Sequence, residues 1–169
     1  TFITGTHVPM ILRIPEKYKH LYPAAKPGSK VERLVSFVDL APTLLSLIGI
    51  EAPEYMQGQA FLGKFQKEEP NYIYMFRDRM DGRYDMSRSI VDAQYRYTRN
   101  FNSNRIYMQH LEYLWRAPSM VSWENAFLSG QCNEVQSRYW NTKPVEELYD
   151  TEKDPWEVNN LAGDPAFAD

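Results

Sequence analysis

Hydrophobic residues in the first third of the chain occur in short runs separated by proline and glycine. Residues 8–14 are rich in β-formers and predict a buried strand of the kind found in parallel sheets, and the proline-rich residues 15–30 predict a loop. A second β-like run covers residues 34–38. Leucines at helical spacing then predict a helix that Asp39 caps and Gly49 ends. This order of elements indicates the last unit of an α/β sheet.

The hydrophobic pattern changes where a charged stretch ends in proline. Beyond that point, runs of β-formers predict strands over residues 72–76, 88–92 and 94–101, and the short connection between the last two fits a hairpin. We therefore divide the chain into residues 1–67, the end of an α/β domain, and residues 68–169, a smaller subdomain.

The last third of the chain carries both helical and extended patterns. Aromatic and leucine residues at helical spacing predict helices within residues 105–140, interrupted by Pro118. A short strand is expected at residues 148–149. Asp154 is then placed as an N-cap, proline occupies the first helical position, and Glu157 is placed for a capping box, so we predict a helix start. Together the elements predict an α+β fold.

Composition and charge narrow the possible partners. The 169 residues carry a net charge of −3 and no block of Lys and Arg, so we expect no binding to nucleic acid by charge. No apolar run approaches the ~20 residues that a membrane-spanning helix needs. Aromatic residues make up 14% of the chain, which is typical of β-rich domains with aromatic cores and also of surfaces that bind sugar rings.

No local motif carries a complete catalytic site. The three histidines lie far apart, and none has a neighbour at zinc-ligand spacing. Cys132, the single cysteine, has no adjacent histidine or basic run, and we expect a buried small hydrophobe. The acidic pairs 68–69 and 146–147 are expected to be solvated. A nucleophile elbow and a phosphate-binding glycine loop are both missing from the sequence.

The densest polar cluster follows the predicted strand 72–76 and alternates arginine with aspartate. In an extended chain Arg77 and Arg79 share one face, and Asp78 lies on the other. Guanidinium groups bind sulfate, phosphate or carboxylate through paired hydrogen bonds, so the cluster is a candidate specificity loop for an anionic sugar. A salt-bridged turn between two strands is the alternative. The candidate substrate-binding residues are Arg77, Asp78, Arg79, Asp81 and Arg83.

A further candidate for substrate binding is His7, which lies just before the predicted strand 8–14. Residues at strand ends often line sites in α/β proteins. The alternative is that His7 only caps or packs the turn.

Five blocks occur in a fixed order: residues 5–11, 35–45, 58–61, 88–100 and 144–162. The second block contains Asp-Leu-Ala-Pro-Thr-Leu-Leu, and the last contains Glu-Leu-Tyr-Asp followed by Asp-Pro. In kind and order, the blocks resemble the C-terminal portion of type I, formylglycine-dependent sulfatases of the alkaline phosphatase superfamily. The likeness spans nearly the whole chain, and the arginine cluster resembles a bacterial subgroup that acts on carbohydrate sulfates.

The resemblance implies a full enzyme with an N-terminal α/β domain and a C-terminal subdomain of about four antiparallel strands packed with helices. It also implies hydrolysis of sulfate esters by a formylglycine beside Ca²⁺, in the periplasm or outside the cell. The Cys/Ser-x-Pro-x-Arg motif that yields formylglycine is not in this sequence, and the family's metal ligands lie N-terminal to the matching region. The resemblance therefore implies no catalytic and no metal-binding residue here, and an inactive isolated fragment.

We therefore expect this chain to supply substrate recognition, through His7 and the cluster 77–85, to hydrolysis of a sulfated glycan. Its expected partners are the N-terminal sulfatase domain of the same protein and the sulfated carbohydrate. One alternative is the C-terminal part of a phosphodiesterase or phosphonate hydrolase of the same superfamily, which a threonine nucleophile upstream would indicate. A non-catalytic carbohydrate-binding or interaction module is the other.

Overall fold

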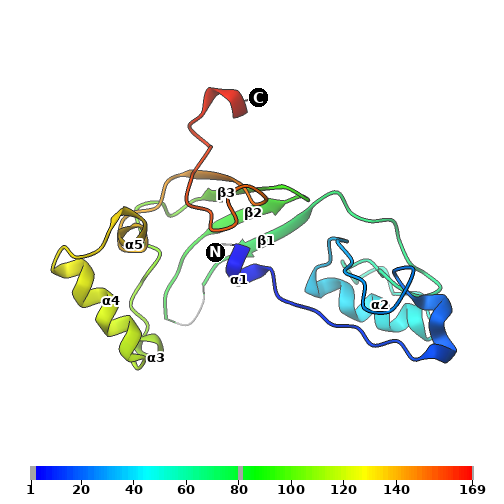
Figure 1. The fold of residues 1–169 in the computed structure, drawn as a ribbon. Coiled ribbons are helices and arrows are strands. Elements are labelled where there is room, and N and C mark those ends of the chain that lie inside the picture. Colours follow the sequence, from blue (N-terminus) through cyan, green and yellow to red (C-terminus); the bar gives the residue numbers. More distant parts are fainter. Residues whose placement is uncertain (1–2, 80–81, 169) are drawn as a thin grey trace. The chain divides into compact units, whose positions relative to one another are not determined.

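The computed structural model describes residues 3–79 and 82–168. These residues form two compact units (Figure 1). One unit holds residues 8–73, and the other holds the chain from Tyr74 onward together with the segment before Val8. The assignment of residues 1–67 to an α/β domain and of residues 68–169 to a subdomain stays a prediction.

The 8–73 unit is built around one helix, α2 (Leu40–Leu47), which a 3-10 turn, η2 (Phe37–Asp39), precedes. Pro42 lies in the first turn of α2, where the missing N–H costs no hydrogen bond. Gly49 follows the end of the helix with a φ of 80°. The predicted helix and its C-terminal stop are both confirmed.

The side of α2 that packs within the unit is polar. Asp39 accepts the N–H of Gln59 at 2.8 Å, Thr43 accepts that of Phe61 at 3.0 Å, and Ser46 accepts that of Phe65 at 2.8 Å. The predicted capping of α2 by Asp39 is wrong, because its second oxygen binds the N–H of Ser36, one turn earlier, at 2.8 Å. Three side chains of one helical segment therefore bind the backbone of residues 59–65.

The apolar stripe of α2 is exposed. Leu44 is 65% exposed and Ile48 is 70% exposed, whereas the buried positions of the helix are Pro42, Thr43 and Ser46. The leucine spacing correctly predicts the helix. The apolar surface that this spacing produces is not covered by the described residues of the chain.

Neither of the two strands predicted in this unit is present. Residues 8–14 have no regular structure, and Ile11 is 93% exposed. Residues 34–38 lead directly into η2. A strand needs a neighbour for its backbone N–H and C=O groups, and none of the described strands lies beside either run. The predicted loop contains one 3-10 segment, η1 (Glu16–Leu21).

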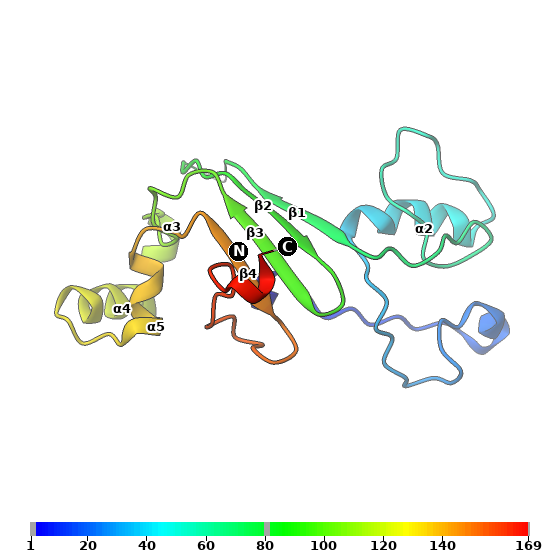
Figure 2. The ribbon, with the colours of Figure 1, turned by 90° about the horizontal axis from the view of Figure 1, so that it is seen from above.

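The other unit contains a four-stranded antiparallel sheet in the order β1-β2-β3-β4 (Figure 2). The strands are β1 (Ile73–Arg77), β2 (Ser87–Val91), β3 (Tyr95–Asn100) and β4 (Glu146–Asp150). Tyr97 of β3 lies opposite Ile90 of β2 and Leu148 of β4. All four strands and the β2–β3 hairpin follow the sequence pattern, and the predicted α+β fold is confirmed.

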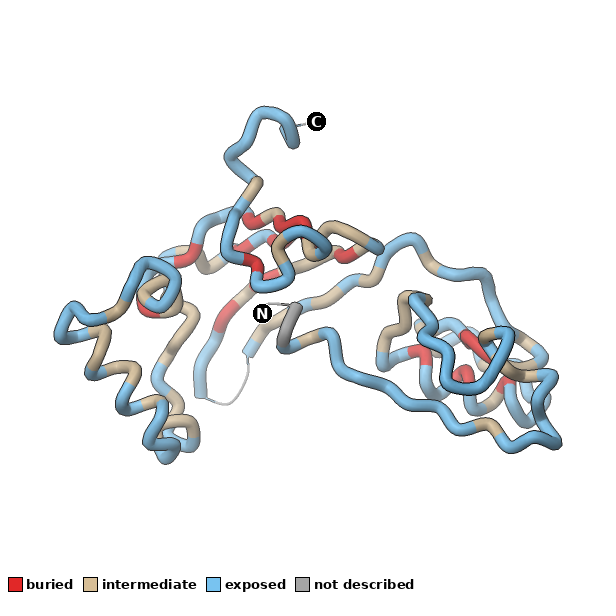
Figure 3. Tube along the Cα trace, viewed as in Figure 1, coloured by how far each residue is buried: buried red, intermediate tan, exposed pale blue. Residues whose placement is uncertain are grey.

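The buried positions of the central strand β3 are polar. Arg96, Thr98 and Asn100 are buried, whereas Tyr95 and Tyr97 on the other face are only partly covered. Figure 3 shows the buried positions gathered along the sheet and around α2. Burial thus alternates along β3, and the side chains that the sheet buries on this face must find polar partners.

Short helices lie together beyond one end of the sheet (Figure 1). They are α3 (Glu112–Trp115), α4 (Pro118–Leu128), α5 (Glu134–Ser137) and the 3-10 turn η3 (Arg138–Trp140). The helical prediction for residues 105–140 is wrong for residues 105–111, where Ile106 instead forms a β-bridge with Thr142. Pro118 begins α4 rather than only interrupting a helix, because its missing N–H is tolerated at the first position.

Aromatic rings hold these helices together. Trp140 is buried, and its ring centroid lies 6.1 Å from Trp115, 5.6 Å from Trp123 and 5.6 Å from Phe127. Edge-to-face and stacked pairs at such distances are favourable beyond the burial of area. The aromatic content is therefore used as a small core between α3, α4 and η3.

The helix predicted from Asp154 is absent, and residues 151–157 form turns. Glu157 is buried with a φ of 53°, and its carboxylate pairs with Arg96 of β3. A left-handed residue ends a helix rather than extending it. The buried ion pair therefore replaces the predicted capping box. Two other short elements are α1 (Ile3–Thr6) and η4 (Pro165–Phe167).

Candidate functional site

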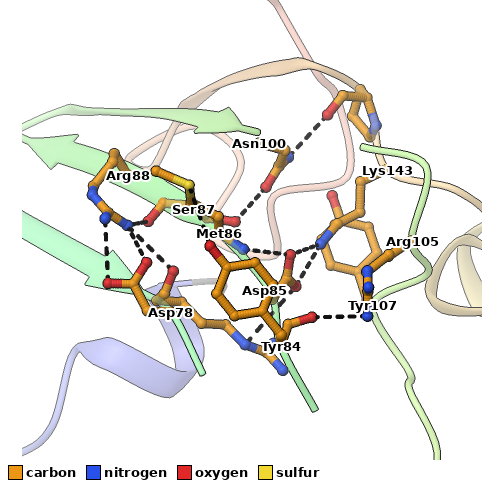
Figure 4. A network of polar contacts seen from close by, with 12 residues as sticks. Asp78, Tyr84, Asp85, Met86, Ser87, Arg88, Asn100, Arg105, Tyr107 and Lys143 are labelled. Atoms are coloured by element: carbon orange, nitrogen blue, oxygen red, sulfur yellow. Dashed lines mark hydrogen bonds and ion pairs between the residues drawn. The ribbon is translucent and has the colours of Figure 1, made fainter. Parts of the chain in front are cut away.

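A buried carboxylate lies behind the predicted arginine cluster (Figure 4). Asp85 is 1% exposed and pairs with the buried Lys143, whose ammonium group also lies 5.7 Å from the ring centre of Tyr107. The Nε of Arg77 lies 3.9 Å from the second oxygen of Asp85. Removing either member of a buried ion pair leaves the other charge buried without a partner, which is strongly destabilising. The pair therefore fixes the chain just before β2.

A second ion pair joins the end of β1 to the start of β2. Arg88 donates from its two Nη atoms to the two oxygens of Asp78, at 2.9 and 3.2 Å. The same guanidinium donates to the Ser87 carbonyl at 2.9 Å and lies 5.8 Å from the ring centre of Phe76. Figure 4 shows this fork facing Asp78. A bidentate pair of this kind sets orientation as well as distance.

Arg77 and Asp78 of the predicted cluster contact other side chains of the chain. Arg77 lies toward Asp85, and Asp78 is bound by Arg88. Arg79 is exposed, and Asp81 lies outside the described residues. The assignment of these four residues to substrate stays a prediction.

Arg83, a third member of the cluster, contacts the segment that precedes α3. Its Nε donates to the carbonyl oxygen of His110 at 2.7 Å. An open depression lies beside this contact and is lined by Gly82, Arg83, His110, Leu111, Glu112, Tyr113 and Arg116. The segment around α3, which sequence reasoning did not select as a site, thus meets the predicted cluster.

His7 is exposed directly after α1. No side-chain hydrogen bond or ion pair joins it to another residue of the described chain. Within the described chain, no hydrogen bond or ion pair therefore links the His7 side chain to the arginine cluster. Its assignment to substrate stays a prediction.

A second buried network centres on Glu147 of β4. The Glu147 carboxylate accepts the hydroxyl groups of Tyr107 at 2.6 Å and Tyr149 at 3.1 Å, and it also accepts the side-chain amide of Asn100. Burial, and then the charge of Glu147, raise the pKa of both phenols well above the usual range, so both remain donors. The predicted solvation of Glu147 is wrong. Strand alternation places it on the same face as Tyr149, which is the signal that could have indicated burial.

Asp150, at the end of β4, holds the turn that follows. Its carboxylate accepts the backbone N–H of Lys153 at 3.0 Å and the side-chain amide of Gln94 at 2.9 Å. The backbone hydrogen bond from Lys153 is the largest of the effects that lower the pKa of Asp150 to about 2. The carboxylate is thus a structural acceptor, and it stays ionised well below neutral pH.

The described residues do not provide a metal site or an activated nucleophile. No three His, Cys, Asp or Glu side chains of residues 3–79 and 82–168 are grouped as ligands for a metal ion. Cys132 is half-buried rather than buried as predicted. The Ca²⁺ and formylglycine expected of the full-length enzyme stay predictions. None of the described helices is long and apolar enough to cross a membrane.

The sheet with its helices has a counterpart among solved structures. A solved structure of a 2-O GAG sulfatase has the same fold, with a TM-score of 0.51 and 23% identity, over 88% of this chain and 24% of that one. The family whose profile matches residues 2–107 is described as N-sulphoglucosamine sulphohydrolase, C-terminal. This chain belongs to that family, and the resemblance to the C-terminal part of a sulfatase is confirmed.

Relatives match along almost the whole chain. An ulvan-active sulfatase of Formosa agariphila is 39% identical over 165 residues, which are 97% of this chain and 26% of that protein. The N-sulphoglucosamine sulphohydrolase of Homo sapiens is 27% identical over 180 residues, covering 97% of this chain and 34% of the relative. The chain thus spans between a quarter and about a third of the length of these relatives.

Proposed function

We propose that this chain is the C-terminal part of a sulfatase that releases sulfate from a sulfated glycan. The carrying observation is the 39% identity to an ulvan-active sulfatase over 97% of the chain. A sulfated glycan of the ulvan kind is accordingly the first substrate to test. The reaction is hydrolysis, in which water and a sulfate ester give the free hydroxyl group and sulfate.

The proposed role of this chain within the enzyme is to recognise the sugar. The described residues lack a metal-ligand cluster, and the sequence lacks the Cys/Ser-x-Pro-x-Arg motif. Formylglycine and Ca²⁺, if the enzyme uses them, would be supplied outside this chain, and none of the contacts described above depends on them. What the chain does supply is a set of arginines at one end of the sheet, beside the buried Asp85–Lys143 pair, that ion pairs and a backbone hydrogen bond hold in place. Guanidinium groups are well suited to sulfate and carboxylate.

The proposed partner of the chain is an N-terminal sulfatase domain of the same protein. The relatives are three to four times as long as the matched region. Leu44 and Ile48 of α2 and the residues 8–14 present apolar side chains to solvent. A patch of this kind on a monomeric protein is costly unless another surface covers it. A larger domain that supplies a neighbouring strand for residues 8–14 would satisfy both observations.

The test is turnover by the full-length enzyme. Sulfate release from ulvan oligosaccharides is measured by ion chromatography, beside bis(4-nitrophenyl) phosphate and a phosphonate monoester as competing substrate classes. We expect sulfate release with kcat/KM on the glycan at least about 100-fold above that on either phosphorus substrate, a margin of roughly 3 kcal/mol in transition-state stabilisation. Preferred turnover of a phosphorus substrate would instead indicate the phosphodiesterase or phosphonate hydrolase alternative.

A further inference from the structure

The depression beside Arg83 combines charge, an aromatic ring and access from solvent. It has a volume of about 540 Å³, within the ~300–1,000 Å³ common for ligand sites. Arg83 approaches from the segment before β2, while Tyr113 and Arg116 come from α3 and the residue that follows it. Tyr113 is 54% exposed, so much of its side chain is accessible to a ligand.

The guanidinium of Arg83 has donors to spare. Its Nε binds the His110 carbonyl at 2.7 Å, and within the described chain its two Nη atoms have no hydrogen-bond partner. The Nη atoms form one edge of the planar group, which suits the two oxygens of a sulfate or carboxylate. The bond to His110 therefore orients Arg83 without using the edge that a ligand would take.

Arg116 can also turn toward an anion at little cost. Its contact with Glu112 is 3.5 Å long, and both side chains are at least 75% exposed. An exposed pair of this kind contributes ~0–1 kcal/mol. A bound anion that accepts hydrogen bonds from Arg116 and Arg83 together would outweigh it.

The backbone under the depression is held firmly. The His110 ring lies 4.4 Å from the Trp115 ring. Trp115 in turn donates from its indole N–H to Glu124 of α4 at 2.6 Å and packs edge-on to the buried Trp140. Arg83 therefore meets a segment that the aromatic core has already positioned, which lowers the entropy lost on binding.

We propose that Arg83, Tyr113 and Arg116 form a subsite for an acidic sugar unit of the substrate, a unit that is not itself cleaved. Paired guanidinium groups would bind its sulfate or carboxylate, and the ring of Tyr113 would pack on the apolar face of the sugar. This inference rests on the proposed function and adds three residues with defined roles to it. Of the three, only Arg83 belongs to the predicted cluster.

The test separates binding of the sugar from chemistry at the sulfate ester. Full-length enzyme is assayed on ulvan oligosaccharides and on 4-nitrocatechol sulfate, which carries no sugar. Arg116→Ala and Arg83→Gln are expected to raise KM on the oligosaccharides about 10-fold, the loss of one hydrogen bond to a charged group, with kcat unchanged. Both variants should match the parent enzyme on 4-nitrocatechol sulfate. The glutamine at position 83 keeps an N–H donor for the His110 carbonyl.

The matched control is Lys19→Ala. Lys19 pairs with Glu16 at 3.7 Å, and both side chains are exposed, as in the Arg116–Glu112 pair. It lies in η1, away from the depression in sequence, and we expect KM to stay unchanged. Equal KM values for Arg116→Ala, Arg83→Gln and the parent enzyme on the oligosaccharides would overturn the subsite.

Two further measurements define the ligand and separate the two proposals. Carboxyl-reduced oligosaccharides identify the group bound: if Arg116→Ala no longer raises KM on them, the subsite binds a carboxylate, and if it still does, a sulfate. Retardation of the enzyme in a gel containing ulvan reports binding without turnover. Retardation that Arg116→Ala loses supports the subsite even if the enzyme releases no sulfate, an outcome that would reject only the proposed function. Equal retardation of both proteins counts against the subsite.

Discussion

Arg96 and Glu157 are 61 residues apart in sequence and meet in the interior of the sheet unit. Their side chains are almost completely buried, and Arg96 also donates to Thr98 at 2.6 Å. Glu157 takes a left-handed backbone conformation to reach Arg96. Such a conformation costs about 1–2 kcal/mol for a residue with a Cβ. The cost is tolerated because a buried arginine without a counter-charge would be worse.

Breaking this pair from either side should be strongly destabilising. We expect Arg96→Ala or Glu157→Ala to lower the free energy of unfolding by about 3–5 kcal/mol, because each leaves one buried charge without its partner. Urea unfolding of the full-length enzyme, followed by proteolysis of the unfolded fraction, measures the change. The double variant should lose much less than the sum of the two single losses.

The next arginine along β3 provides the control for that cycle. Arg99 lies 3.5 Å from Glu146, and both side chains are about half exposed. Arg99→Ala should cost ~0–1 kcal/mol. A loss of several kcal/mol there, or single Arg96 and Glu157 losses that simply add, would contradict the assignment of stability to the buried pair.

At the scale of elements, α2 and the segment 59–65 of the 8–73 unit approach each other closely. Gly63 has a φ of 93°, and a Cβ at this position would lie 2.6 Å from the backbone carbon of Ser46. Backbone N–H groups of the segment 59–65 donate hydrogen bonds to the side chains of Asp39, Thr43 and Ser46. The helix and the segment 59–65 therefore share one backbone-to-side-chain interface, and it has no room for a side chain at residue 63.

Gly63→Ala tests this interface. Gly28→Ala is the control, because it separates the cost of a left-handed backbone conformation from the cost of the steric clash. Gly28 has a φ of 81° with nothing within 4 Å of the added Cβ, so alanine there costs only the left-handed conformation, ~1–2 kcal/mol. Alanine at 63 should cost a further ~1–3 kcal/mol from overpacking. Thermal unfolding of the two variants should show the larger fall in Tm for Gly63→Ala. Equal falls would mean that the contact relaxes freely.

The elements that sequence could predict are those whose pattern is local or is satisfied by a nearby strand. β2 and β4 each pair with β3, and the leucine spacing predicts α2 although its apolar stripe is left uncovered. The predicted strand 8–14 is absent because none of the described strands pairs with it, and no local pattern reports a missing neighbour. The helix predicted from residue 154 is absent because Glu157 instead forms a buried ion pair with Arg96, which is far away in sequence. For the site, the arginine cluster could be predicted from charge alone, whereas the α3 segment could not, because only the fold brings Tyr113 and Arg116 beside Arg83.

At the scale of the whole molecule, both units combine a few buried apolar side chains with buried polar ones. The sheet unit pairs Asp85 with Lys143 and Arg96 with Glu157, and it has an aromatic core around Trp140. The 8–73 unit buries the apolar residues 60–62 beside the polar side of α2 and leaves the apolar stripe of α2 exposed. This stripe is the surface of the 8–73 unit on which a covering domain can be tested.

If the proposed N-terminal domain covers the apolar stripe of α2, substitutions in the stripe should have different effects on stability in the isolated chain and in the full-length enzyme. In the isolated chain, Leu44→Ser and Ile48→Ser replace exposed side chains, so Tm should stay constant and binding of the dye ANS should fall. In the full-length enzyme the same side chains would be buried against the partner domain. Each substitution should then lower stability by about 2 kcal/mol or more, close to the value for a fully buried leucine or isoleucine.

Leu128→Ser is the control, because Leu128 is 74% exposed at the end of α4 outside this stripe, and it should be neutral in both settings. A full-length enzyme that tolerates Leu44→Ser and Ile48→Ser as readily as Leu128→Ser would show that no domain covers α2.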